Sequence, residues 1–295
     1  MKLATKCSLL ALALPFLLAG CGGGGSNPGV PMIGAARVTK VVDFEPTGSV
    51  APGKPTSVSF RIQQADGTPL TKFKRGPGPH TGVHLIYVRD DLSTIIHHHP
   101  PVAAGGKIVD PVTFAKPGPY RLVIDVYPAK CPGSSTPAVP GAPIRTCNFQ
   151  LFEKVTAAGA YKPAPLPPTS QAQTVAGCRF ALGGAAQLAA IQATLVHVSV
   201  TCNGKPATFQ TYYGALAHAI FFRQGSLDYF HTHVCAPGAT GCTSFLGGAQ
   251  VTGRSATPGK LTVGVLVPVP GTWRLFLQAQ VGGKILTAPF TLHVT

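Results

Sequence analysis

The residues best suited to chemistry are histidines, which occur in two similar arrangements. In each, a single histidine is followed 13 positions later by the first member of a His-x-His pair. Side chains at positions i and i+2 of a β-strand lie on one face, so each pair can offer two imidazoles to one ion. Imidazole is a ligand of Cu(II), Zn(II) and Ni(II). The predicted ligands are His84, His97 and His99 in the first arrangement, and His218, His231 and His233 in the second.

Hairpin register decides whether the single histidine joins its pair. If His84 lies opposite a member of its pair, all three share a face, whereas opposite His98 it faces away. The first case needs a connection with an even number of residues, such as one centred on Asp90-Asp91 or, in the second copy, on Gln224-Gly225. An odd connection gives the second case. The sequence leaves both open.

The remaining histidines are weaker candidates. His80 precedes His84 by four positions and is a candidate extra ligand of the first arrangement, although the second copy has no counterpart. His98 should point away from its neighbours on the strand. Lone histidines on a sheet are usually structural, and we assign that role to His197 and His293.

The histidine arrangements belong to a longer duplication. Residues 117–122 (Pro-Gly-Pro-Tyr-Arg-Leu) match residues 270–275 (Pro-Gly-Thr-Trp-Arg-Leu), in the same order relative to the histidines. We therefore predict two copies of one domain, joined by a semi-rigid Pro/Ala-rich linker. The predicted boundaries are a signal peptide at 1–20, a flexible tether at 21–35, domains at 36–156 and 175–295, and the linker at 157–174.

Short strands must position these residues. Residues 57–62 and 193–200 alternate polar and apolar side chains, and residues 122–126, 275–279 and 290–294 form further apolar runs. Many glycines and prolines with only 11% charged residues disfavour long helices. The Gly-x-aromatic-x-Leu motif resembles a tyrosine corner. The sequence predicts an all-β protein of two tandem immunoglobulin-like antiparallel β-sandwiches after a lipoprotein signal peptide.

The first thirty residues predict export. Lys2 and Lys6 precede a short apolar run at 9–18, and Leu-Ala-Gly-Cys21 resembles the lipobox of bacterial lipoproteins. We expect a lipid anchor on Cys21 and a Gly-rich tether, with the domains in the cell envelope, facing the periplasm or the exterior. Ordinary secretion with a chance cysteine is the alternative, and the membrane leaflet stays open.

Cysteine use and charge agree with that compartment. Six cysteines remain after Cys7 and Cys21, and an even number in an oxidising compartment indicates disulfides. We favour pairing between cysteines that are neighbours along the chain. A thiolate metal site is the alternative, although the sequence has no Cys-x-x-Cys motif. The net charge of +15 comes mainly from scarce acidic residues and indicates a solvated basic surface, not nucleic-acid binding. The favoured pairs are Cys131–Cys147, Cys178–Cys202 and Cys235–Cys242.

Residues 80–125 and 213–290 resemble a family of exported bacterial proteins with repeats of His-Leu-Ile/Val, Asp-Leu-Ser/Ala and His-x-His-Pro. The first copy carries Asp91-Leu92-Ser93 and a proline, Pro100, after His99; in the second, Val234 replaces that proline. The resemblance implies immunoglobulin-like domains and association with heavy metals such as copper. Only Met32 remains for a methionine-based Cu(I) site, so histidine ligation favours Cu(II) or Zn(II).

The predicted function is a non-catalytic envelope lipoprotein that binds copper or zinc through the histidines of each domain. The alternative is a structural or adhesive immunoglobulin-like module, in which the histidines serve the fold and a second envelope protein is the partner. We do not expect an enzyme, because the sequence has no carboxylate pair placed as in a glycosidase or a protease dyad, no Gly-x-Ser-x-Gly motif and no His-Glu-x-x-His motif. The expected partners are the membrane through Cys21, a metal ion and an envelope protein.

Overall fold

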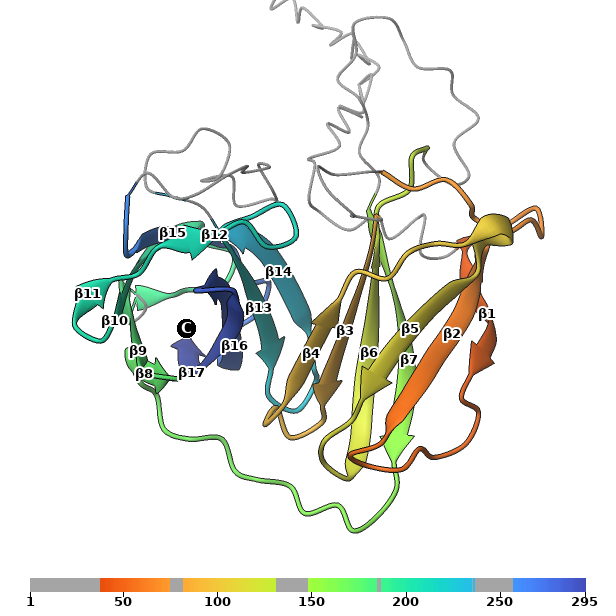
Figure 1. Ribbon diagram of the computed structural model, residues 1–295, viewed down its shortest axis with the longest axis horizontal. Helices are drawn as coiled ribbons and strands as arrows, with labels where there is room; N and C mark the ends of the chain where they lie inside the picture. Colours follow the sequence, from red (N-terminus) through yellow and green to blue (C-terminus); the bar gives the residue numbers. More distant parts are fainter. Residues whose placement is uncertain (1–37, 75–81, 131–147, 185–186, 235, 237–256) are drawn as a thin grey trace, which may run out of the picture.

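The computed structural model describes residues 38–74, 82–130, 148–184, 187–234, 236 and 257–295, and antiparallel sheets dominate it (Figure 1). The predicted all-β fold of two immunoglobulin-like sandwiches is confirmed. No helix of the described part is long and apolar enough to cross a membrane. Several predictions concern residues outside the described ranges: the signal peptide, the tether with Cys21, His80, and the pairs Cys131–Cys147 and Cys235–Cys242.

The first sandwich packs a three-stranded sheet against a four-stranded sheet. Strand residues 57–62 show why: their apolar members, Val58, Phe60 and Ile62, are fully buried in the core, and the residues between them are partly exposed. A 3-10 turn, Ala104–Gly106, precedes β5. The sheets are β1 (Lys40–Glu45), β2 (Pro55–Gln63) and β5 (Ile108–Thr113), and β4 (Ile95–His98), β3 (Val83–Arg89), β6 (Gly118–Val126) and β7 (Phe149–Ala157).

The second sandwich consists of two five-stranded sheets around a core that includes Phe221, Trp273 and Phe290. One sheet contains β8 (Ala172–Val175), β9 (Cys178–Gly183), β10 (Thr194–Cys202), β11 (Lys205–Pro206) and β15 (Lys260–Val265). The other contains β12 (Phe209–Gln210), β13 (Ala217–Arg223), β14 (Tyr229–Val234), β16 (Gly271–Val281) and β17 (Lys284–Val294).

The repeated Pro-Gly-x-aromatic motif forms the same corner in both sandwiches. The Tyr120 hydroxyl donates to the backbone carbonyl four residues upstream at 2.9 Å, and the Trp273 indole N–H does the same at 3.1 Å. Gly118 and Gly271 have φ of 121° and 132°, a region that side chains with a Cβ rarely adopt. The duplicated motif therefore starts β6 and β16 alike.

One predicted disulfide lies within the described residues and is confirmed. Cys178 and Cys202 face each other across β9 and β10 and are bonded. The bond closes a loop with a sequence separation of 24 between the two neighbouring strands.

Removing this disulfide should lower the free energy of unfolding by about 3 kcal/mol, because the unfolded chain regains the entropy of the open loop. The measurement is urea unfolding of a Cys178→Ala/Cys202→Ala variant against the parent under oxidising conditions. The same comparison with a reductant is the control, and there the difference should shrink. Equal midpoints under oxidising conditions would contradict the prediction.

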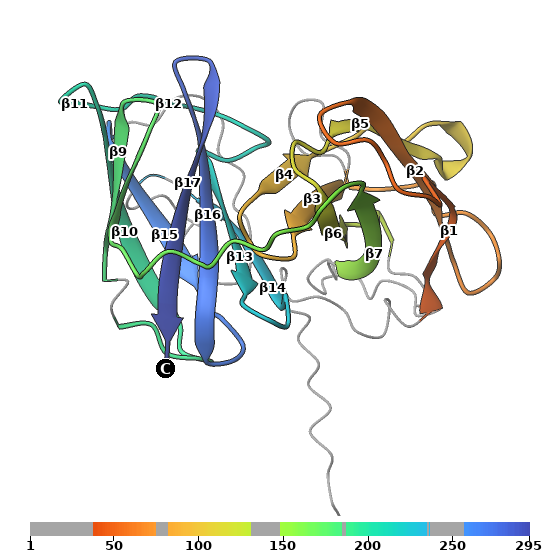
Figure 2. The same ribbon diagram turned by 90° about the horizontal axis from the view of Figure 1, so that it is seen from below.

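The two sandwiches pack against each other through the sheets that carry β3 and β13 (Figures 1 and 2). Every residue of β3 is buried, because Leu85 and Tyr87 face their own core while Ile86 and Val88 face the other sandwich. This part of the interface is apolar and uses equivalent positions of the two copies. Its fully or almost fully buried members are Ile86, Val88, Leu92, Val123, Ile220, Phe222 and Phe276.

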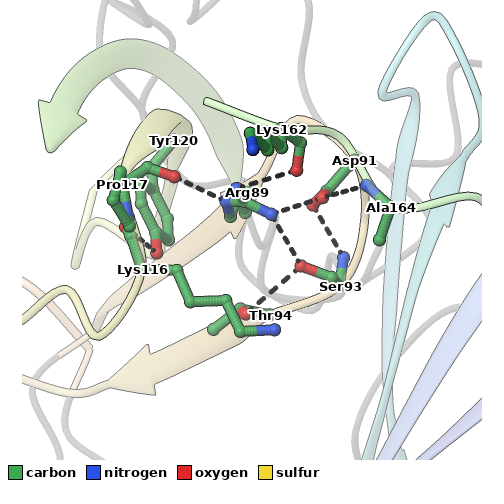
Figure 3. A network of polar contacts seen from close by, with 9 residues as sticks. All are labelled: Arg89, Asp91, Ser93, Thr94, Lys116, Pro117, Tyr120, Lys162 and Ala164. Carbon is green, nitrogen blue, oxygen red and sulfur yellow. Dashed lines mark hydrogen bonds and ion pairs between the residues drawn. The ribbon is translucent and has the colours of Figure 1, made fainter. Parts of the chain in front are cut away.

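The segment between β7 and β8 is fixed to the first sandwich by a buried polar network (Figure 3). Arg89 forms an ion pair with Asp91, and the two side chains are only 6% and 2% exposed. The Ala164 N–H donates to Asp91 at 2.9 Å, and Arg89 reaches the carbonyl of Lys162 at 3.5 Å. These contacts hold the linker on the β3–β4 turn, and Leu166 then packs on the interface between the sandwiches.

Candidate metal centre between the two sandwiches

The hairpin register places the histidines of each copy on one face. In the first copy Ile86 pairs with His97 and Leu85 with His98, so His84 lies on the same face as His97 and His99. In the second copy His218 pairs directly with His233. The register that the sequence left open is therefore the one with an even connection in both copies.

His98 points away from this face, as expected for the middle residue of a strand triplet. Its Nδ1 lies 2.9 Å from Asp110, a buried carboxylate that also accepts a hydrogen bond from the Tyr87 hydroxyl at 2.8 Å. His197 and His293 are exposed on β10 and β17 and do not join the other histidines.

All six predicted ligands meet in one cluster between the sandwiches. The sequence predicts one set in each domain, but several rings approach each other across the interface at distances similar to those of most pairs within a sandwich. The His97 ring centroid lies 5.0 Å from that of His218 and 5.4 Å from that of His231. The His84 and His231 centroids are 5.5 Å apart. We call these six residues the histidine cluster: His84, His97, His99, His218, His231 and His233.

Two groups within the histidine cluster have nitrogens close enough to share a metal ion. In each group the ligand atoms lie within 4.8 Å of one another. One group takes two histidines from the first sandwich and one from the second, and the other lies within the second sandwich. The groups are His84, His97 and His231, and His218, His231 and His233, so that His231 belongs to both.

Asp125 is a further site residue, which is not among the ligands predicted from the sequence. It is 2% exposed, pairs with His84 across β3 and β6, and places Oδ2 3.8 Å from His84 Nδ1 and 3.7 Å from His231 Nδ1. The Tyr127 and Tyr229 hydroxyls donate to it at 3.1 and 3.5 Å. Burial and the nearby carboxylate raise the pKa of both tyrosines well above the usual value, so they stay protonated as donors.

The duplication offers a signal for this residue. Asp125 and Gln278 occupy the same position of the repeated corner strand, and each pairs with the single histidine of its copy. Gln278 accepts a hydrogen bond from His97 Nδ1 at 3.0 Å, and Asp125 faces His231. Each copy thus reaches the first His-x-His histidine of the other copy, as in a two-fold dimer interface. The two halves differ in charge, since only Asp125 is an acid.

Two tyrosines of the second sandwich cover histidines of the first sandwich. The Tyr213 ring stacks on His99 with centroids 3.7 Å apart, and the Tyr212 hydroxyl donates to the His97 carbonyl at 3.4 Å. No feature of the sequence marks these residues as site residues, because they precede the repeated block of histidines that begins at His218. They cover the rings of His97 and His99, which are both buried.

Burial keeps these histidines neutral. Desolvation lowers the pKa of His97, His99 and His218 well below the ordinary value, and neighbouring histidines lower it further. The His218 Nε2–H donates to the Tyr212 carbonyl at 2.9 Å, which leaves Nδ1 to accept from His231 Nε2–H at 3.0 Å. In the neutral form of His231, Nδ1 therefore carries a bare lone pair.

The metal-free protein should lose stability in acid. Above pH about 6.5 these histidines are neutral in both the folded and the unfolded chain. Below it the unfolded chain binds protons that the folded chain resists, so the free energy of unfolding falls by up to about 1.4 kcal/mol per pH unit for each histidine. Urea unfolding in the presence of a metal chelator, at pH 7.5 and at pH 5.5, measures the two free energies of unfolding. Equal free energies of unfolding at the two pH values would contradict it.

Comparisons with known proteins give a family and weak structural likenesses. A family model described as "Domain of unknown function (DUF8832)" matches residues 36–131 and 173–295. No curated protein matches the chain. Invasin, a bacterial integrin-binding protein, is 14% identical with a TM-score of 0.22, over 87% of this chain and 38% of its own. The Escherichia coli adhesin FdeC is 13% identical with a TM-score of 0.23, over 87% of this chain and 64% of its own. This chain therefore spans under two thirds of either protein.

Proposed function

The chain belongs to the DUF8832 family, whose name assigns no activity, and from that premise we propose that the histidine cluster binds a divalent transition metal between the two sandwiches. The ion is Cu(II) or Zn(II), and the role is non-catalytic binding. The observation that carries the proposal is the approach of two electron-rich groups, the His231 Nδ1 and the Asp125 carboxylate, inside a buried site.

The electrostatics of that approach support a cation. His231 Nδ1 and Asp125 Oδ1 are buried and have no hydrogen-bond partner among the described residues. A buried carboxylate without a matching cation is costly. The two tyrosine hydroxyls neutralise only part of this cost, and the nearby histidines with lowered pKa resist protonation. A metal ion would satisfy the carboxylate and the lone pair together.

The distances support the same conclusion. Two ligand atoms bonded to one tetrahedral ion at about 2.1 Å lie about 3.4 Å apart, further than a hydrogen bond would hold them. Asp125 Oδ2 lies 3.7 Å from His231 Nδ1 and 3.8 Å from His84 Nδ1. Asp125 is therefore a few tenths of an ångström beyond ligand spacing from each of the two rings, which supports the carboxylate as a further ligand.

The donor types favour the borderline dications. The described cluster offers imidazole nitrogen and carboxylate oxygen, with no thiolate or thioether, and such ligands suit Cu(II) and Zn(II) better than Cu(I). The half of the histidine cluster that contains Asp125 supplies a negative charge, which favours binding of a dication. Which of the two ions the protein takes depends on supply as well as affinity.

Titration calorimetry tests the proposal. The purified full chain, in mild detergent, should bind Cu(II) or Zn(II) with micromolar or tighter affinity, and His97→Ala with His231→Ala should weaken binding by at least about 100-fold. His98→Ala is the matched control, because His98 lies on the same strand and faces Asp110 instead. Absence of binding heat, or equal loss with His98→Ala, would refute the proposal.

A second candidate is an immunoglobulin-like structural or adhesive module in which the histidines serve only the fold. The observation in its favour is that several histidines already satisfy one another, as His99 Nε2 and His97 Nε2 do at 3.0 Å. The same titration separates the two, since this candidate gives no metal binding, while His97→Ala still lowers the free energy of unfolding.

The place of action is part of the proposal. An acylated Cys21 would anchor the sandwiches to the cell envelope, where an envelope protein could exchange the metal or bind the module. The Cys178–Cys202 disulfide supports an oxidising compartment. Incorporation of labelled palmitate into the chain, lost in Cys21→Ala, checks the anchor; incorporation that persists in the variant would contradict it.

A further inference from the structure

We propose that the histidine cluster holds two metal ions, with His231 bridging them. The inference rests on the proposed function and adds the number of ions and the ligand set of each. One ion would use His84, His97, His231 and Asp125, and the other His218, His231 and His233.

The bridging role follows from the direction of the two ring nitrogens of His231. Nε2 lies 3.0 Å from His218 Nδ1, on the side of the second group. Nδ1 lies 3.7 Å from Asp125, on the side of His84. The ring is 2% exposed and stands between the two groups, so one nitrogen faces each.

Apart from the shared His231, each group has its own ligands. The His84 and His218 rings come from different sandwiches, and each pairs with the corner strand of its own copy, through Asp125 and Gln278. The carboxylate makes the first group the stronger site for a dication. The second group, made of three imidazoles, is the weaker site.

Bridging has a defined proton balance. In the metal-free protein His231 Nε2–H donates to His218 Nδ1. When the second ion binds, Nε2 forms a bond to it and its proton leaves to the solvent, which makes the ring an imidazolate between two cations. No oxidant or reductant is required, and each Cu(II) stays in its oxidation state.

The test counts copper and unpaired spins in the same sample. The full chain, in mild detergent, is saturated with Cu(II), desalted, and measured by elemental analysis and by integrated electron paramagnetic resonance. The expected result is two copper ions per chain with a spin count well below two, because exchange through the bridging ring couples the spins. One ion per chain would overturn the inference and leave the proposed function standing. Two ions with a full spin count would overturn the bridge. No bound copper would overturn both.

Variants of each half keep the test independent of folding defects at one position. His84→Ala combined with Asp125→Asn leaves the first half with two imidazoles, as His233→Ala does in the second half. Each should retain one copper ion with a full spin count, while His98→Ala should keep two coupled ions. Two coupled ions in either half-site variant would overturn the assigned ligands.

Discussion

Ile220→Asp is expected to weaken Cu(II) binding by about 10- to 100-fold, although it removes no histidine. Ile220 is fully buried in the apolar interface between the sandwiches. An ionised carboxylate there costs several kcal/mol, and the easiest relief is separation of the two sandwiches. Separation would take His84 and His97 away from His231. Titration calorimetry measures the affinity, and small-angle X-ray scattering measures the radius of gyration, which should rise.

The matched control is Ile191→Asp, the same chemical change in the same sandwich at a side chain that is 80% exposed. It should change neither the affinity nor the radius of gyration. If Ile220→Asp opens the sandwiches and the affinity stays the same, one sandwich binds the metal alone, and a site shared by both is wrong.

Asp91→Ala is expected to lower the free energy of unfolding by about 3–5 kcal/mol, the usual cost of leaving a buried charge without its partner. Asp91 holds the buried Arg89 and accepts from the backbone of Ser93 and Ala164. Burial alone would raise the pKa of Asp91, but these hydrogen bonds and Arg89 bring it below the usual value. The variant should also release the linker from the β3–β4 turn. Urea unfolding at neutral pH gives the free energy.

The second copy supplies the control for this prediction. Asp228 lies near the corresponding turn, 3.6 Å from Arg223, but both side chains are substantially exposed, at 44% and 34%. Asp228→Ala should therefore cost less than about 1 kcal/mol. Equal losses of unfolding free energy in the two variants would mean that burial does not increase the contribution of the Arg89–Asp91 pair to stability.

The sequence predicts the local parts of this architecture well, because they depend on residues close together along the chain. Alternation identifies β2 and β10, and the Pro-Gly-x-aromatic motif identifies both corners. The shared face of each His-x-His pair follows from strand geometry alone. The Cys178–Cys202 pair follows from the short loop that it closes.

The composition of the site depends on contacts that are distant in sequence. The mostly apolar sequence of β3 indicates that both faces of the strand are covered, but it does not show that the second sandwich covers one of them. The register depends on turn residues such as Leu92, whose positive φ of 58° is not evident from its side chain. Asp125 becomes a site residue only because β6 pairs with β3, which is not its neighbour along the chain. Two separate sets of histidines therefore become one cluster only in the folded protein.

The most direct test is to locate the metal in crystals of the Zn(II)-loaded protein by anomalous diffraction at the zinc edge. The account predicts at least one peak about 2.1 Å from ligand nitrogens of both sandwiches, His84 or His97 on one side and His231 on the other. A result in which every peak is bonded only to the histidines of a single sandwich, or only to His98, His197 or His293 on other faces, would contradict it.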